Sequence, residues 1–198
     1  MTTQHDLNLK VQHRIRESVA VKEALLSDTQ LVSLVAEVGH DLAEVLRGSH
    51  RAFLFGNGGS AADAQHMAAE LVGRYLHERP GLPVMALTVN SSSLTAIAND
   101  YSYDAVFARQ LEALGSAGDM VIGISTSGNS RNVLLAIEAA KRKGMTSVGL
   151  TGQGGGQLKD LADRCICVPS ADTPRVQEVH ILIGHILCEI VEAELFGG

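Results

Sequence analysis

The spacing of apolar residues changes near residue 48 of the chain. Before it, apolar residues recur at helical spacing, most clearly at Leu31, Leu34, Val35, Val38, Leu42, Val45 and Leu46. Gly48 follows, and glycine commonly ends a helix. After it, short apolar runs alternate with longer segments of helical periodicity. We therefore predict two helices within about residues 5–48, followed by alternating strands and helices.

The short runs are continuous and apolar, as expected for strands that are covered on both faces of a parallel sheet. They lie at residues 52–55, 84–89, 120–124, 147–150 and 165–168. The main helices beyond residue 48 are predicted at 61–75, 103–114, 132–143 and 174–196. Alternating strands and helices form right-handed crossovers around a parallel sheet. The predicted fold class is α/β, a three-layer αβα sandwich with a five-stranded parallel sheet. An N-terminal helical arm (1–48) and a domain (49–198) would form a single structural unit.

The composition fits one folded domain and argues against nucleic-acid and membrane partners. Of the 198 residues, 45% are apolar and 19% are charged, which allows a buried core. The net charge is −6, and only 4% of the residues are aromatic. A duplex-binding protein normally carries a basic face, and a single-strand binder needs rings for base stacking. The apolar segment 181–196 is interrupted by one His and three Glu, so we expect no membrane span.

The cysteines and the N-terminus indicate the compartment. Cys165, Cys167 and Cys188 are an odd set without the spacing of a zinc ribbon or a redox pair. We interpret them as buried, reduced thiols of a cytoplasmic protein. The N-terminal residues contain no apolar segment typical of a signal peptide, so none is expected.

Small polar residues follow three of the predicted strands, at 56–60, 125–130 and 151–156. Ligands of open parallel sheets bind at the carboxyl ends of the strands. The 125–130 loop carries four hydroxyl side chains and a glycine at the start of a helix, where free N–H groups favour a phosphate. It lacks the Lys of a nucleoside-triphosphate loop and the glycine spacing of a dinucleotide site. A serine-rich loop with ordinary helix caps is the alternative, but the 56–60 loop beside it favours a phosphate site.

Two further groups of residues could carry chemistry. His66 and Glu70 lie four residues apart on one face of the predicted helix 61–75, where they could bind a divalent metal or act as proton donor and base. A solvated helix face with one hydrogen bond is the alternative. The otherwise apolar last helix contains Gln177, Glu178, His180 and His185. Two histidines there must face a partner, an interface or a site, although a single one is more often a core residue.

Four segments of the sequence resemble the phosphoheptose isomerases, which are sugar isomerase (SIS) domain proteins. In order along the chain they are GNGGSAADAQHMAAELVGRY, LTAIANDYSYD, GISTSGNSRNV and RVQEVHILIGHILCEIVE. The resemblance implies an SIS fold and the isomerisation of D-sedoheptulose 7-phosphate to D-glycero-D-manno-heptose 7-phosphate. This reaction is the first step towards bacterial heptose for lipopolysaccharide core or other surface sugars. The resemblance also implies a cytoplasmic, typically tetrameric enzyme that binds zinc.

The same resemblance assigns roles to residues within these segments. It implies Glu70 as the base and His185 as its acid/base counterpart. The implied zinc ligands are His66, Glu70, Gln177 and His185. The implied substrate contacts are Asn57, Gly58, Gly59, Ser60, Glu70, Asn99, Asp100, Ser125, Thr126, Ser127, Ser130 and Gln177, with Ser60 near the phosphate.

The spacing of two implied ligands constrains the metal site. Gln177 and His185 are eight residues apart, which is about 12 Å along a straight helix. Their side chains can only just converge on one ion, and His180 between them need not share the site. Ligands from two subunits would relieve this strain. We therefore expect the active sites to lie at subunit interfaces of the homotetramer that the resemblance implies, with the last helix packed there.

The residue types fit the implied reaction independently of the resemblance. Moving a carbonyl between neighbouring carbons requires a group that takes a proton from one carbon and returns it to the next, a role that suits Glu70. An imidazole or a metal must stabilise the charge that develops on the sugar oxygen, a role that suits His185. The hydroxyl loop would bind the phosphate and so position the reacting carbons.

Two other functions remain as alternatives. A close relative of the family is a non-catalytic regulator that binds the replication initiator protein, and the segments RPGLPVMAL and LTAIAND resemble it as well. The presence of both Glu70 and His185 favours the enzyme. An isomerase for another sugar phosphate, such as arabinose 5-phosphate, would use the same phosphate loop.

Overall fold

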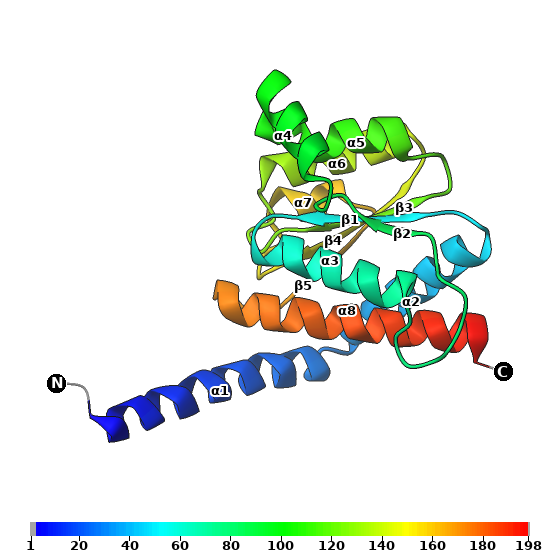
Figure 1. The fold of residues 1–198 in the computed structure, drawn as a ribbon. Helices are drawn as coiled ribbons and strands as arrows, with labels where there is room; N and C mark the ends of the chain where they lie inside the picture. The colour runs from blue at the N-terminus through cyan, green and yellow to red at the C-terminus, as the bar shows by residue number, and fades with distance from the viewer. Residues whose placement is uncertain (1–2, 198) are drawn as a thin grey trace.

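The five predicted apolar runs form one parallel sheet in the computed structural model, which describes residues 3–197 (Figure 1). The strands are β1 (Ala52–Gly56), β2 (Val84–Ala86), β3 (Met120–Ile124), β4 (Thr146–Thr151) and β5 (Arg164–Cys167). Their order across the sheet is β2-β1-β3-β4-β5, and each neighbouring pair is parallel. In this register Leu54 lies beside Ala86 on one side and Ile122 on the other. The predicted α/β class with a five-stranded parallel sheet is confirmed.

Helices cover both faces of the sheet, as Figure 1 shows. One layer contains α2 (Thr29–Arg47), α3 (Gly59–Val72) and α8 (Thr173–Phe196), and the other contains α4 (Ser91–Asp100), α5 (Val106–Leu114), α6 (Arg131–Arg142) and α7 (Gly156–Leu161). Successive side chains of a strand point to opposite faces, so Leu54 enters the first core and Phe55 the second. The three-layer arrangement is therefore confirmed. Within the described residues, no helix is both long enough and apolar enough to cross a membrane.

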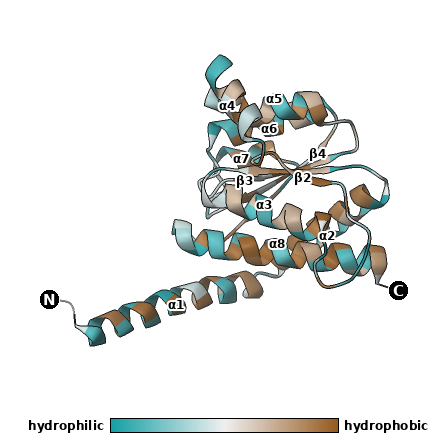
Figure 2. Ribbon diagram, in the orientation of Figure 1, coloured by the Kyte–Doolittle hydropathy of each residue, from teal (hydrophilic) through white to brown (hydrophobic). Residues whose placement is uncertain are grey.

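The first helix, α1 (Gln4–Ser27), projects from the rest of the molecule (Figure 1). A capping box between Thr3 and Asp6 begins it, and Asp28 caps the start of α2. Figure 2 shows apolar patches along α1, and its exposed apolar residues include Leu7, Val11, Ile15 and Val19. In contrast, α2 packs against α8 and contributes to the core. The division into an arm (1–48) and a domain (49–198) stays a prediction.

The sequence pattern missed two helices and misplaced the ends of three elements, among them the helix predicted at 61–75, which ends at Val72. Helix α4 contains no buried residue, so its apolar periodicity is weak, although Asn90 caps its start by accepting a hydrogen bond from the N–H of Ser93. Helix α7 is only six residues long. The strand predicted at 84–89 ends at Ala86, because the chain turns there towards α4. The helix predicted at 103–114 begins as a 3-10 turn, η1 (Tyr103–Ala105).

The strand order changes direction between β1 and β3. From β1 the chain first adds β2 on one side, and it then returns past β1 to add β3 on the other side. The loops that follow β1 and β3 therefore lead to helices on opposite faces of the sheet, α3 and α6. A crevice opens between such loops, beyond the carboxyl ends of the strands, and it is the usual ligand site of this architecture.

Candidate active site

Helices α3 and α8 lie side by side in one layer, which brings together residues that are far apart in the sequence (Figure 1). The Met67 side chain of α3 packs directly against Gly184 of α8, since a Cβ atom on this glycine would lie 2.8 Å from Cγ of Met67. The neighbours of these two residues, His66 and His185, face each other across the helix pair. The packing of Gly184 against Met67 therefore lies directly beside the two imidazole rings.

His66, Glu70 and His185 form a compact cluster. Nε2 of His66 is 3.0 Å from Nε2 of His185 and 3.3 Å from Oε1 of Glu70. One ligand atom from each of the three residues can be chosen so that all lie within 4.8 Å of one another. Two imidazole nitrogens and a carboxylate oxygen are donors that suit zinc. The cluster therefore fits a divalent metal as well as acid/base chemistry.

Gln177, the fourth implied ligand, lies nearer the start of the same helix pair. Its side-chain amide contacts the backbone of Gly59, where a Cβ atom would lie 2.5 Å from Nε2 of Gln177. Gly59 precedes His66 by seven residues on α3, which is about 10 Å along the helix axis. Three of the four implied ligands thus meet within one chain. The assignment of Gln177 as a ligand stays a prediction.

The ring of His185 lies between two other rings. Tyr75 stacks on it, with ring centroids 5.6 Å apart and an angle of 18° between the planes. His66 approaches edge-on, with centroids 5.1 Å apart, and the hydroxyl of Tyr75 donates to Oε1 of Glu189 at 3.4 Å. Tyr75 was not predicted as a site residue, because its position depends on the path of the loop after α3. It limits the rotation of the His185 ring.

The hydroxyl side chains of the 125–130 loop gather between β3 and α6. Oγ of Ser125 is 2.9 Å from Oγ of Ser130 and 3.5 Å from Oγ of Ser127. Ser130 is the N-cap residue of α6, but its side chain makes no capping hydrogen bond with the described part of the chain. Its hydroxyl can therefore turn towards a ligand. Together with the N–H groups at the start of α6, these hydroxyls form a suitable site for an anion.

The glycine-rich loop after β4 packs against this hydroxyl loop. The N–H of Gly152 donates to the carbonyl of Thr126 at 3.0 Å. Gly128 has a φ of +67°, and a Cβ atom there would overlap the carbonyl oxygen of Gly155. Only glycine fits such a position. The loop after β4 therefore holds the backbone of the hydroxyl loop in place.

Asn57 connects the loops after β1 and β3. Its amide and that of Asn132, in the first turn of α6, exchange hydrogen bonds of 2.9 and 2.8 Å. The hydroxyl of Tyr103 also donates to Oδ1 of Asn57, at 3.1 Å. Neither Asn132 nor Tyr103 was predicted. A signal existed only for Asn132, which is a polar residue on the buried face of an amphipathic helix. These contacts hold the Asn57 side chain between the loops after β1 and β3.

The remaining predicted substrate contacts lie at the ends of two helices. Gly58, with a φ of +57°, precedes α3, and a Cβ atom there would meet nothing within 4 Å. Ser60 is buried in the first turn of α3. Asn99 and Asp100 end α4, where they are exposed and share a hydrogen bond of 2.9 Å. Their roles towards substrate, like those of the other loop residues, are still predictions.

Two other titratable groups lie on α8 and α3. His180 is fully buried, and its Nε2–H donates to the carbonyl of Thr151 at 3.1 Å. Burial lowers the pKa of His180 to about 4, so it is a neutral core residue. Asp63, which was not predicted, lies one turn before His66. Burial raises its pKa, and its Oδ2 has no hydrogen-bond partner within residues 3–197.

Comparison with known proteins shows the family to which this chain belongs. The family model described as the SIS domain matches residues 19–152, which is more than half of the chain. The parallel sheet and its hydroxyl loop are therefore those of a SIS domain protein. The phosphoheptose isomerase of Sulfurimonas denitrificans is 52% identical over 187 residues, 94% of this chain and 96% of the relative. The chain belongs to the phosphoheptose isomerases.

Other relatives agree with this assignment. The phosphoheptose isomerase of Aneurinibacillus thermoaerophilus is 53% identical over 190 residues, 96% of this chain and 96% of the relative. The solved structure of phosphoheptose isomerase from Neisseria gonorrhoeae matches with a TM-score of 0.89 and 40% identity, covering 94% of this chain and 99% of that chain. The predicted family and the prediction of an isomerase are confirmed.

Proposed function

We propose that this isomerase converts D-sedoheptulose 7-phosphate to D-glycero-D-manno-heptose 7-phosphate. This reaction would supply heptose for lipopolysaccharide core or other bacterial surface sugars. The observation that carries the proposal is the meeting of Glu70 and His185, on two different helices, around the shared neighbour His66 at 3.3 and 3.0 Å. Relatives that are 52% and 53% identical carry the name phosphoheptose isomerase, which supports this substrate.

In the proposed reaction a proton moves from C1 to C2 of the sugar through an enediol. Glu70 removes the proton from C1 and returns it to C2, because one carboxylate can serve both carbons in turn. His185 exchanges a proton with the sugar oxygens while charge develops on them. The Tyr75 ring keeps the imidazole in a fixed plane during these transfers.

The substrate is held by residues that take no part in the proton transfer. Ser125, Thr126, Ser127 and Ser130 bind the phosphate, and Ser60 lies near it. The sugar contacts Asn57, Gly58, Gly59, Asn99, Asp100 and Gln177. Binding energy from the distant phosphate holds C1 and C2 against Glu70, which lowers the entropic part of the barrier.

We also assign one zinc ion per subunit to His66, Glu70, Gln177 and His185. The mutual distances of the first three donors support this assignment. When bound, zinc would act as a Lewis acid that stabilises negative charge on the sugar oxygens.

The enzyme is proposed to be a cytoplasmic homotetramer with active sites at its subunit interfaces. The exposed residues Leu7, Val11, Ile15 and Val19 form an apolar stripe along α1. This stripe supports assembly, because exposed apolar patches usually pack against a partner. An apolar cavity of about 170 Å³ lies between α2 and α8 at the C-terminal end of α1, where Leu25 lines it together with residues that include Ile183 and Ile190. Three unpaired cysteines support a reducing compartment.

Replacement of Glu70 tests the proposed function. Glu70→Gln keeps the shape of the side chain but removes the base, so turnover of sedoheptulose 7-phosphate should fall at least ~100-fold. Incorporation of deuterium from solvent into the product, followed by NMR, should fall with it. Glu138→Gln, on α6, is the matched control and should keep parental turnover. A Glu70→Gln enzyme within a few-fold of the parent would rule out this role.

The same assay separates the alternative functions when a panel of ketose phosphates is offered. Faster turnover of a five-carbon sugar phosphate would identify an isomerase for another substrate. A protein that converts none of the sugars and binds the replication initiator protein would instead be a regulator. The proposal expects the seven-carbon sugar to react fastest.

A further inference from the structure

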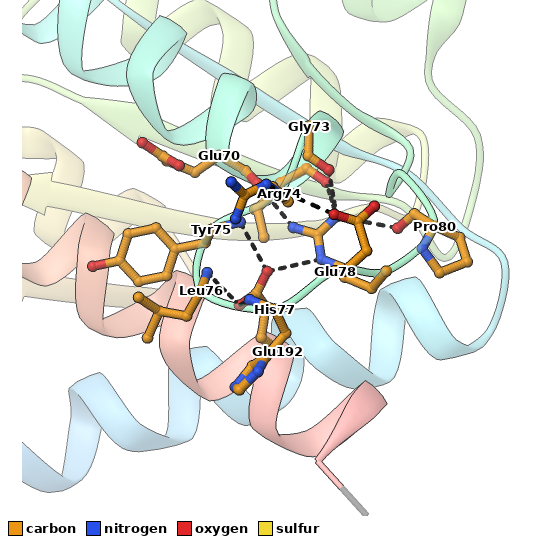
Figure 3. A network of polar contacts seen from close by, with 11 residues as sticks. Glu70, Gly73, Arg74, Tyr75, Leu76, His77, Glu78, Pro80 and Glu192 are labelled. Carbon is orange, nitrogen blue, oxygen red and sulfur yellow. Dashed lines mark hydrogen bonds and ion pairs between the residues drawn. The ribbon is translucent and has the colours of Figure 1, made fainter.

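A buried ion pair joins the loop after α3 to helix α8, close to the proposed active site (Figure 3). Nε of Arg79 donates to Oε1 of Glu192 at 2.9 Å, and each side chain is only 1% exposed. Burial of two charges gains little net stability, because the loss of hydration offsets their attraction. A purely stabilising role is therefore a weak explanation for this pair.

Arg79 donates hydrogen bonds to the carbonyl groups at the end of α3. Its Nη2 donates to the carbonyl of Glu70 at 2.8 Å, and its Nη1 donates to the carbonyl of Leu71 at 2.7 Å. Weaker contacts of 3.2 and 3.1 Å reach the carbonyls of Gly73 and Pro80. The last carbonyls of a helix have no partner within it and carry partial negative charge. The guanidinium therefore fixes the turn of α3 that carries Glu70.

Glu192, on α8, binds the N–H groups of the loop that follows α3. Its carboxylate accepts hydrogen bonds of 2.8–3.0 Å from three consecutive backbone N–H groups, those of Tyr75, Leu76 and His77. Burial alone would raise the pKa of Glu192, but these bonds and the Arg79 contact together hold the pKa below its ordinary value. The carboxylate is thus ionised and binds the loop tightly to α8.

The ion pair acts on both helices of the His66–Glu70–His185 cluster. Glu192 lies seven residues after His185, which is almost two full turns, so both side chains project from the same face of α8. Glu192 also holds the backbone of Tyr75, whose ring stacks on His185. Figure 3 shows Glu70, the loop and Glu192 joined in one network.

We propose that Arg79 and Glu192 are positioning residues, which set the separation of Glu70 from His185 and the orientation of the His185 ring. This inference rests on the proposed function, because Glu70 and His185 are the proton-transferring groups of that function. Proton transfer requires heavy atoms about 2.6–3.2 Å apart, and an error near 1 Å can cost about 100-fold in rate. Both residues act through backbone groups and the Tyr75 ring.

Two replacements test the proposal. Arg79→Lys keeps the charge but loses the planar fork that reaches several carbonyls. The double variant Arg79→Met with Glu192→Leu removes both charges, so neither remains buried without a partner. In both variants kcat should fall at least ~10-fold, while KM for sedoheptulose 7-phosphate stays within about three-fold, because the hydroxyl loop lies on other elements.

A second measurement reports on the His185 ring without turnover. In protein labelled with ¹³C at histidine Cε1, the Tyr75 ring current shifts the His185 resonance, which is assigned by its absence from His185→Gln. In the Arg79 and Glu192 variants this resonance should move towards its position in Tyr75→Leu. A role in overall stability alone would leave it in place in folded protein.

Arg164→Met is the matched control, because Arg164 pairs with Asp41 and Glu37 on α2 and has no contact with the network of Figure 3. It should keep parental kcat and an unshifted His185 resonance. Folded variants of Arg79 and Glu192 with parental kcat and resonance would overturn the proposal, as would failure of both to fold. If the positioning proposal fails in this way, the proposed function still stands as long as the parent enzyme is active and Glu70→Gln is inactive. Parental turnover by Glu70→Gln would defeat the proposed function itself.

Discussion

The two histidines of α8 show how surroundings decide the chemistry of a residue type. His180 is enclosed by the core, and its one donor is used by the carbonyl of Thr151. Its Nδ1 is buried without a hydrogen-bond partner in the described part of the chain. A proton on this atom would leave a charge without hydration or partner, so burial lowers the pKa of His180 to about 4. His185 lies instead among Tyr75, His66 and the Glu70 carboxylate.

Stability should therefore fall in acid through His180. Above pH 6.5 the ring is neutral in both the folded and the unfolded state. Between pH 6.5 and about 4 the unfolded state binds a proton that the folded state excludes, so the free energy of unfolding decreases as the pH falls. The total loss is about 3 kcal/mol, reached below pH 4. His180→Gln keeps a donor for Thr151 but cannot titrate. Between pH 7.5 and 4.5 its free energy of unfolding should therefore fall by about 2–3 kcal/mol less than that of the parent.

Urea unfolding at pH 7.5, 5.5 and 4.5 measures this difference. His13→Gln removes an exposed imidazole from α1 and serves as the control. Equal acid losses in the parent and His180→Gln would show that other groups cause the acid sensitivity.

Among the elements, the strand–loop–helix unit of β3, 125–130 and α6 carries the proposed phosphate site. Its strand is fully buried and its loop is held by the neighbouring glycine-rich loop. The hydroxyls are therefore presented by a rigid backbone without contributing to either core. Removal of these hydroxyls should therefore weaken substrate binding without lowering the stability of the fold.

Ser127→Ala and Ser130→Ala test that separation. Loss of one hydrogen bond to a charged phosphate costs about 1.5–3 kcal/mol, so the affinity for sedoheptulose 7-phosphate should weaken roughly 10- to 100-fold for each change. Calorimetric titration measures the affinity, and thermal unfolding should change little. Ser33→Ala, on the exposed side of α2, is the control. Unchanged affinity in both loop variants would place the phosphate elsewhere.

The elements that the sequence pattern predicted best are those whose apolar residues are fully enclosed. The runs at 52–55 and 120–124 match β1 and β3 to within a residue, because strands covered on both faces are continuous in apolar character. Helix α4 was missed for the opposite reason, since it buries no residue. Strand order is a property of the whole sheet and has no signal in any single segment.

At the scale of the whole molecule, α1 exposes apolar residues along its length in a single chain, and Figure 2 shows the apolar patches on this helix. The proposed homotetramer would bury it. Val11→Asp with Ile15→Asp should then shift the mass measured by light scattering from four chains towards smaller species, because charges would be buried at the interface. His13→Asp with Ala20→Asp, on the opposite face of α1, is the control. A mass unchanged by the stripe variant would exclude α1 from the interface.

The candidate site was predictable only in part, because several of its contacts depend on how distant elements of the whole molecule pack together. The polar types and spacings of His66 and Glu70 pointed to chemistry before any fold was known. The contact between His66 and His185, which are 119 positions apart in the sequence, depends on the packing of α3 against α8. Tyr75 and the Arg79–Glu192 pair depend on loop paths and on burial, which local sequence does not encode, whereas Asn132 left a signal as a polar residue on the buried face of α6.

The pairing of α3 with α8 also has a consequence during synthesis. His66 and Glu70 leave the ribosome well before His185, which follows His66 by 119 residues. At ~5–20 residues per second this delay lasts about 6 to 24 seconds. During that interval the nascent chain holds two of the cluster's three groups, and α3 has no α8 beside it. The His66–Glu70–His185 cluster therefore forms only when α8 has been made and docks on α3. A nascent chain that has passed residue 130 but lacks α8 has the proposed phosphate loop without the complete proposed proton-transferring pair.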